Sequence, residues 1–171
     1  MNHRDVLSLS AILALGLALL PSDAVSQQKS LKEQIVGSWT YASADTVAPD
    51  GKRTPTFGPN PSGLTIFGSD GRYVSFVVRA DVPKFAANSR TAGTPEENKA
   101  VVQGGIATFG RYTVNEADHT LTLNIERSSY PNWNGIEQKR PMTLAGDELT
   151  YTVPVASGGG GRGEVVLKRV K

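Results

Sequence analysis

The 171-residue chain has no cysteine and only two histidines. Without cysteine it can form no disulfide and offers no thiolate nucleophile, so its fold has to be held together by burial of a core. His3 stands among the first residues, and His119 falls in the turn-like stretch "NEADHT". A Ser-His-Asp triad and a transition-metal site are therefore poorly supported, and we expect no metal or other cofactor.

An excess of one charge is also lacking. The chain has 18 basic and 16 acidic residues, a formal net charge of +2, spread along the sequence. A nucleic-acid-binding domain would show clustered lysines and arginines, so nucleic acid is not an expected partner. The carboxylate pairs Glu96/Glu97 and Glu116/Asp118 fall in a predicted helix cap and a predicted turn, where we expect solvated side chains rather than an acid–base pair.

The apolar run from Val6 to Leu20, "VLSLSAILALGLALL", is about 15 residues long, short of the roughly 20 that a membrane-spanning helix needs. Charged residues precede it and small residues follow it, which is typical of a secretory signal peptide. We predict a signal peptide over residues 1–26, cleaved after Ser26. The protein would then be exported to the periplasm or the extracellular space with no stable membrane span; a retained anchor helix is the alternative.

The rest of the chain divides into a tether and one domain. Residues 27–34 are polar and predict a flexible tether. Residues 35–171 consist of short alternating apolar runs separated by turn residues, as in "TLTLNIER" and "LTYTV". We predict an all-β fold, a single antiparallel up-and-down β-barrel of about 8–9 strands with one short helix, because closure removes exposed sheet edges. A sandwich would show the same alternation.

Two local sequence patterns each predict a particular element, one a hairpin and the other a helix. The Asp70-Gly71 pair predicts a tight hairpin, because glycine supplies the positive φ that such turns need. In "GTPEENKAVVQGG", Thr94 and Glu97 form a capping-box pattern around Pro95, which predicts a helix from Pro95 to Gln103. This helix has little apolar surface, so we expect it to cover one end of the barrel rather than to fill a core.

The stretch "SSYPNWNG", residues 128–135, predicts a corner. Pro131 excludes a central strand, and the asparagines and the final glycine suit a turn. Tyr130 and Trp133 on this corner either plug the end of the barrel or rim its opening, and both have a polar atom suited to a rim.

Five stretches in this order resemble the bacterial and fungal lipocalin-like domain family, a set of small calycin-type barrels, over about residues 34–170. They are "IVGSWTYAS", "FGPNPSGLTIFGSDGRYVSFVVRAD", "AGTPEENKAVVQGGIATFGRYTV", "YPNWNGIEQKR" and the final "LKR". The resemblance implies a barrel whose G-x-W signature is Gly37-Ser38-Trp39, with Arg169 from the last strand lying across the indole. It therefore implies structural roles for Trp39 and Arg169. Members of the family often have a histidine pair where this chain has Leu123-Asn124, so no histidine chemistry is implied.

A closed barrel of this size commonly leaves room for one small ligand. Either face of the strand "RYVSFVVR" could point inward, so arginines and aromatic residues of several strands remain candidates. We predict that ligand-binding residues of the interior or rim come from one set: Phe76, Arg79, Phe109, Tyr112, Glu126, Tyr130, Trp133 and Arg140.

Three functions stay open at this point. The first is a non-enzymatic exported barrel that binds a small apolar molecule. The second is an isomerase or cyclase that uses Glu126 with Tyr112 or Arg140 as acid, base or charge stabiliser. The third is a filled barrel whose surface binds a protein or envelope partner. An apolar cavity with one arginine would favour the carrier, and a carboxylate within hydrogen-bond reach of a tyrosine in a cavity would favour the enzyme. The absence of a cavity would leave the third function.

Overall fold

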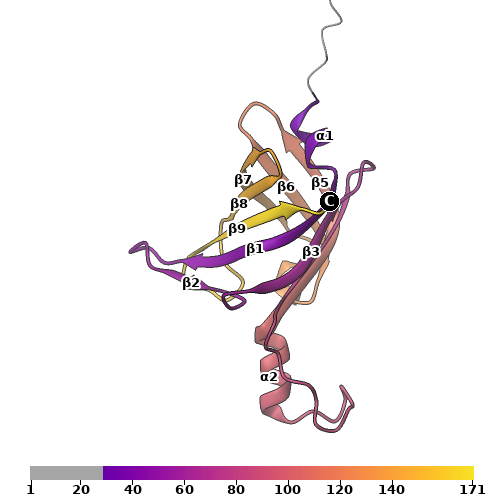
Figure 1. Cartoon of the computed structure of the whole chain (residues 1–171), viewed down its shortest axis with the longest axis vertical. Helices are drawn as coiled ribbons and strands as arrows, with labels where there is room; N and C mark the ends of the chain where they lie inside the picture. Colours follow the sequence, from indigo (N-terminus) through magenta and orange to yellow (C-terminus); the bar gives the residue numbers. More distant parts are fainter. Residues whose placement is uncertain (1–28) are drawn as a thin grey trace, which may run out of the picture.

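The computed structural model describes residues 29–171, and the predicted signal peptide lies outside them. Nine strands and two short α-helices make up this part of the chain (Figure 1). The elements are α1 (Leu31–Ile35), β1 (Gly37–Val47), β2 (Arg53–Pro55), β3 (Pro61–Phe67), β4 (Arg72–Arg79), α2 (Pro95–Gly104), β5 (Gly105–Asn115), β6 (Thr120–Ser128), the 3₁₀ helix η1 (Pro131–Trp133), β7 (Glu137–Ala145), β8 (Glu148–Val153) and β9 (Arg162–Arg169).

Eight of these strands form a closed antiparallel barrel. Consecutive strands from β3 to β9 are neighbours, and β1 pairs with β3 on one side and with β9 on the other. The closing seam runs from the Trp39–Arg169 pair to the Val47–Arg162 pair. The short β2 pairs only with the end of β1. The predicted barrel is therefore confirmed, and closure distinguishes it from a sandwich.

The turns that the sequence predicts are present. Gly71 has φ +80°, and the Asp70 side chain accepts a hydrogen bond from the Arg72 amide at 3.0 Å between β3 and β4. Strand alternation also places the apolar faces as expected, because Leu121, Leu123 and Ile125 of β6 are all at most 2% exposed. Their polar neighbours face outward.

One end of the barrel is closed by packed aromatic rings. Trp39 is fully buried and its indole Nε1 donates a hydrogen bond to the Ile35 carbonyl at 2.8 Å. The Arg169 guanidinium lies 4.2 Å from the centre of the Trp39 ring. Phe67 and Tyr112 pack edge to face beside them, with ring centres 5.0 Å apart. This arrangement has the geometry that the family resemblance implies for Trp39 and Arg169.

The segment predicted as a flexible tether differs from that prediction. Its last residues begin α1, since Ser30 and Glu33 cap this helix reciprocally. The Glu116 carboxylate also accepts hydrogen bonds from the amides of Leu31 (2.8 Å) and Lys32 (3.1 Å). A glutamate 85 residues further along the chain thus fixes the helix start, and sequence spacing alone gives no sign of this long-range contact.

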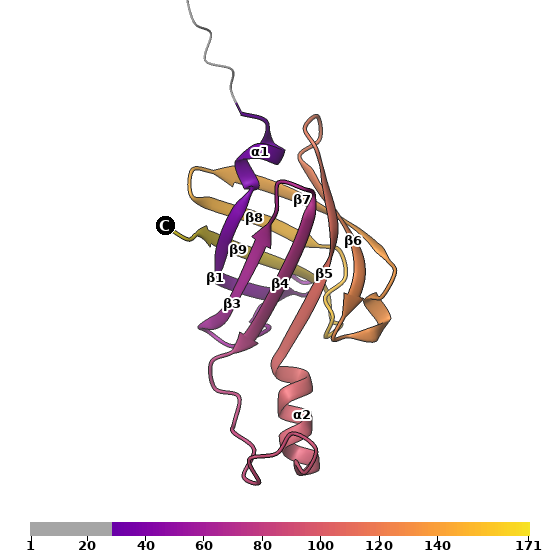
Figure 2. The same ribbon diagram turned by 90° about the vertical axis from the view of Figure 1, so that its right-hand side faces the viewer.

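Helix α2 begins at the predicted cap and ends one residue later than predicted, at Gly104. Thr94 and Glu97 form the capping box, and Pro95 occupies the first turn. Figure 2 shows α2 projecting away from the barrel rather than lying across its end. Val102 is accordingly 77% exposed. Over residues 29–171, no helix is long and apolar enough to span a membrane.

Candidate functional site

A cavity lies inside the barrel at the end opposite Trp39. The space that the centre of a water molecule can occupy is about 60 Å³. All the space that protein atoms leave unfilled, including solvent at the open mouth, is about 530 Å³. Because the larger figure includes this solvent, the space inside the barrel suits only a small ligand. The wall residues are Tyr41, Ala44, Asp45, Thr56, Phe57, Ser75, Val77, Ile106, Thr108, Trp133, Arg140, Val153, Ala156, Ser157, Gly163 and Val165.

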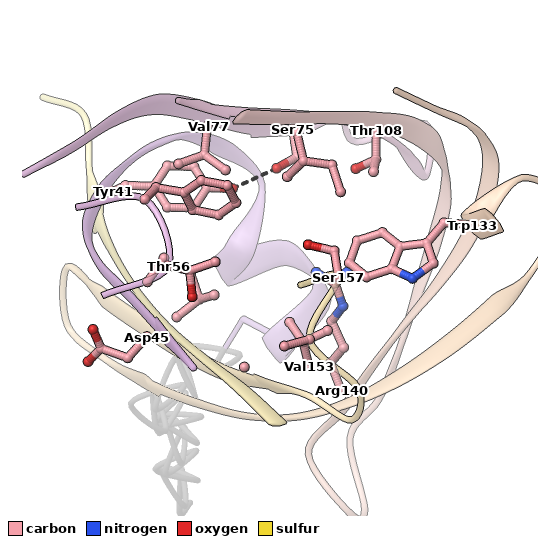
Figure 3. A pocket seen from close by; sticks show the side chains of 16 residues that line it. Tyr41, Asp45, Thr56, Ser75, Val77, Thr108, Trp133, Arg140, Val153 and Ser157 are labelled. Atoms are coloured by element: carbon pink, nitrogen blue, oxygen red, sulfur yellow. Dashed lines mark hydrogen bonds between the residues drawn. The ribbon is translucent and has the colours of Figure 1, made fainter. Parts of the chain in front are cut away.

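Hydroxyl groups gather on one wall of this cavity. The Tyr41 hydroxyl and the Ser75 hydroxyl are 2.7 Å apart, a hydrogen bond that Figure 3 shows as a dashed line. Behind them, the Thr65 hydroxyl lies 3.0 Å from Ser75 and donates to Tyr41 at 3.3 Å. Because these oxygens share hydrogen bonds, the wall can donate to or accept from a ligand without moving.

The corner "SSYPNWNG" supplies the opposite wall. Pro131–Trp133 form the 3₁₀ helix η1, and the Asn134 side chain accepts a hydrogen bond from the Ser128 amide at 2.7 Å, which ties the corner to the end of β6. Trp133 points toward the cavity in Figure 3. Tyr130 supports it edge to face, with ring centres 5.7 Å apart. The corner therefore positions an aromatic residue at the rim.

Arg140 is the single basic residue among the cavity walls. Strand β7 alternates so that Gln138, Arg140 and Met142 face inward, and Arg140 is only 5% exposed. Its Nε and Nη2 atoms both donate to Gln138 Oε1, at 3.2 and 2.6 Å. Its guanidinium carbon also lies 5.1 Å from the centre of the Tyr151 ring. The strand thus holds a buried charge beside apolar walls.

Two tyrosines near Arg140 are buried, and burial makes them harder to ionise than an ordinary tyrosine. Burial raises the pKa of Tyr151 well above its ordinary value. Burial also raises the pKa of Tyr73, and Arg140 opposes this shift only in part. The Tyr73 hydroxyl has no hydrogen-bond partner among residues 29–171, and the nearby Thr108 side chain opposes part of its pKa shift. Neither tyrosine supplies a negative charge to Arg140 near neutral pH.

The structure brings some of the predicted site residues together at this cavity. Trp133 and Arg140 line it, and Tyr130 packs behind Trp133. Tyr112 is buried, but at the closed end of the barrel, where its hydroxyl donates to the Gly68 carbonyl at 2.8 Å. It therefore belongs to the core that closes the barrel and not to the cavity wall.

Four other predicted residues lie on the outer surface. Phe76 is 49% exposed, because the inward face of β4 consists of Tyr73, Ser75 and Val77. Phe109 is 45% exposed, because the buried residues around it on β5 are Thr108, Gly110 and Tyr112. Arg79 pairs with Asp81 in solvent at 2.8 Å. The sequence left both faces of β4 open, and the pairing of β4 with β3 and β5 selects the one without Phe76.

The fourth outward residue is Glu126. Its carboxylate lies 3.6 Å from Arg72 and 3.9 Å from Arg111, in ion pairs on the outside of the barrel. A bulge between Phe109 and Gly110 shifts the register of β5 against β6 next to this glutamate. Glu126 is thus separated from both Tyr112 and Arg140, which the enzyme hypothesis would place beside it.

Sequence reasoning did not assign Tyr41 and Thr108 to the site. A signal for Tyr41 was present, because it lies two residues after Trp39 on the same strand and hence on the same inward face. Thr108 had no such signal, since a threonine fits either face of a strand. Among residues 29–171, no group of three His, Asp or Glu side chains is placed to hold a metal ion.

Comparison with known proteins agrees with this geometry. A family model described as a lipocalin-like domain matches residues 36–170. A 4′-hydroxy-3′-methoxypropiophenone carrier protein of Aspergillus oryzae is 32% identical over 91 residues, which cover 48% of this chain and 82% of the carrier protein.

Proposed function

Since this chain belongs to the lipocalin-like domain family, we propose that it is a carrier that binds one small, largely apolar molecule in the open end of its barrel, without catalysis. The observation that supports this most strongly is the cavity itself. It combines aliphatic side chains, the rings of Tyr41 and Trp133, and one arginine. Small-molecule sites are typically built in this way, from apolar walls and a few fixed polar groups.

An aromatic ligand fits the proposal best. The relative from Aspergillus oryzae is named as a carrier of an aromatic ketone. Trp133 and Tyr41 face the same space in Figure 3, so a flat ring would contact an aromatic side chain on each side. The small volume of the cavity, about 60 Å³ for the centre of a water molecule, favours a single-ring compound over a long lipid chain.

The position of the acidic groups supports binding rather than catalysis. Glu126 lies on the outer surface, away from Tyr112 and Arg140. The acidic side chain among the cavity walls is that of Asp45, and Arg53 holds its carboxylate at 3.0 Å. No tyrosine among residues 29–171 forms a hydrogen bond to either carboxylate, so a ready acid–base pair is missing from the described site.

We also propose that the carrier acts outside the cytoplasm. The apolar run over residues 6–20 supports this, although it lies outside the described residues.

Native mass spectrometry of the protein, purified gently from its host, tests the proposal. We expect a stoichiometric small molecule that is released on denaturation. Trp133→Ala should weaken retention roughly tenfold or more, since it removes a ring of the wall. Phe76→Ala is the matched control, because it removes an exposed aromatic ring from the outer face of the same barrel. An empty protein that also fails to bind added propiophenone would refute the carrier.

A further inference from the structure

Within the part of the chain that the structure describes, the charge on Arg140 has no counter-charge. Among residues 29–171, no aspartate or glutamate forms an ion pair with it. Asp45, the acidic wall residue, is already paired with Arg53. Tyr73 and Tyr151 are neutral near pH 7, as tyrosines ordinarily are, and burial raises their pKa values further. A buried charge without a counter-charge is costly, and a binding site is where proteins commonly keep one.

The free donors of Arg140 have a defined geometry. A guanidinium has five N–H groups, and Gln138 accepts from Nε and Nη2 on one side of the fork. The end of the fork, made by Nη1 and the second hydrogen of Nη2, has no acceptor among residues 29–171. Arg140 is a wall residue of the cavity, and Nη1 is not among the fully buried, unpartnered side-chain nitrogen and oxygen atoms of residues 29–171. Two parallel N–H groups match the two oxygens of a carboxylate.

The rest of the cavity suits a flat ring attached to such a group. In Figure 3 the side chain of Arg140 and the indole of Trp133 enter the same space, across from the Tyr41–Ser75 pair. Val77, Val153 and Val165 form apolar walls around it. A planar acid could therefore pair its oxygens with Arg140 while its ring contacts Trp133.

We propose that the site is specific for small aromatic acids, whose carboxylate pairs end-on with Arg140. The inference rests on the proposed carrier function and adds a requirement for negative charge. It assigns Gln138 a positioning role, since its carbonyl oxygen fixes the plane of the guanidinium. The ligand class is thus an anion, where the named relative carries a ketone.

Calorimetric titration with two probes of equal size tests this inference. Cinnamate and benzylideneacetone share one planar skeleton and differ in having a carboxylate or a methyl ketone. We expect the unmodified protein to bind cinnamate roughly 10- to 100-fold more tightly, the usual range for a charge-assisted contact. Arg140→Met should abolish this preference, because it removes both the charge and the paired donors.

Two further variants make the result specific. Arg140→Lys keeps the charge but not the fork, so it should retain only part of the preference. Arg79→Met is the matched control, because it removes an exposed arginine far from the cavity walls, and it should change neither affinity. Its result separates an effect of net charge from an effect of Arg140.

The outcomes separate the two proposals. Equal binding of the two probes by the unmodified protein, or a preference that survives in Arg140→Met, would overturn the charge requirement and leave the carrier intact. Binding of neither probe would overturn the proposal of an aromatic acid, and native mass spectrometry would then decide the carrier proposal. If Arg140→Met does not fold, the comparison of Arg140→Lys with the unmodified protein decides: a full preference in the lysine variant refutes the fork geometry.

Discussion

The contact between Arg169 and Trp39 should be a major stabilising element of the barrel. The two residues pair directly across the seam between β1 and β9. The guanidinium lies 4.2 Å from the ring centre, Nη1 donates to the Val36 carbonyl at 3.1 Å, and Nη2 donates to the Gln34 carbonyl. We predict that Arg169→Met strongly destabilises the fold.

The magnitude follows from these contacts. A cation–π contact over a fully buried indole contributes about 1–2 kcal/mol. Each hydrogen bond from a charged group contributes about 1.5–3 kcal/mol, which we reduce because the Arg169 side chain is 27% exposed. The ion pair with the half-exposed Asp147 adds little. Since these contributions are not additive, we expect a loss of about 3 kcal/mol in the free energy of unfolding, or roughly 10 °C in Tm.

Urea denaturation followed by far-UV circular dichroism measures this loss. Arg162→Met is the control, because Arg162 lies at the other end of the same strand pair, is 50% exposed and pairs only with Glu164. It should cost less than about 1 kcal/mol. If Arg169→Met costs no more than the control, the seam is not held by this contact, and the structural role of the arginine would be refuted.

Further predictions concern the stability of single-residue variants and its dependence on pH. A Cβ at Gly110 would lie 2.0 Å from the Asn124 carbonyl oxygen, so Gly110→Ala should lower the free energy of unfolding, measured by urea denaturation, by about 3 kcal/mol or more. Gly158 has open space around it, so Gly158→Ala should lower it little. Tyr73→Phe removes a buried hydroxyl that has no partner, and its unfolding free energy should equal or exceed that of the unmodified protein. Because the pKa values of Tyr73 and Tyr151 are raised, the folded protein keeps their protons above pH ~10, whereas the unfolded chain releases them. The free energy of unfolding should therefore be constant below pH ~10 and should fall above it, by up to about 1.4 kcal/mol per pH unit for each tyrosine. Tyr73→Phe should reduce this slope. Arg140→Met should leave thermal stability unchanged or raise it, because it replaces an uncompensated charge by an apolar chain of similar length, and a Tm loss of more than about 5 °C would contradict this.

The barrel could be predicted from sequence because its signals are local. Alternation in "TLTLNIER", the Asp70-Gly71 turn and the capping box at Thr94 each depend on residues a few positions apart. Such signals fix element type and order. They explain why the strands and α2 were expected in the right places.

The site was harder to predict because its geometry depends on pairing between strands. An alternating strand has two faces, and the residue pattern of β4 suits either one, so Phe76 was a candidate until the structure placed Tyr73, Ser75 and Val77 inside. Arg79 shares the inward face by alternation, but it is the last residue of β4 and pairs with Asp81 in solvent. The bulge at Gly110 similarly controls the environment of Glu126. Arg140 was named as a candidate from its place on a strand, yet only the structure shows that it lacks a counter-charge.

Arg140 and Arg169 both face inward in the barrel but differ in what they bind, and this difference separates structure from function. Arg169 donates hydrogen bonds to two backbone carbonyls and lies on the indole of Trp39, so its contacts stabilise the fold. Arg140 lies near the aromatic ring of Tyr151 in a similar way but has only one side-chain amide as acceptor. A fold that needed Arg140 for stability would supply it with carbonyls or a carboxylate, as it does for Arg169. Because it does not, the remaining donors are best explained by a ligand that completes them.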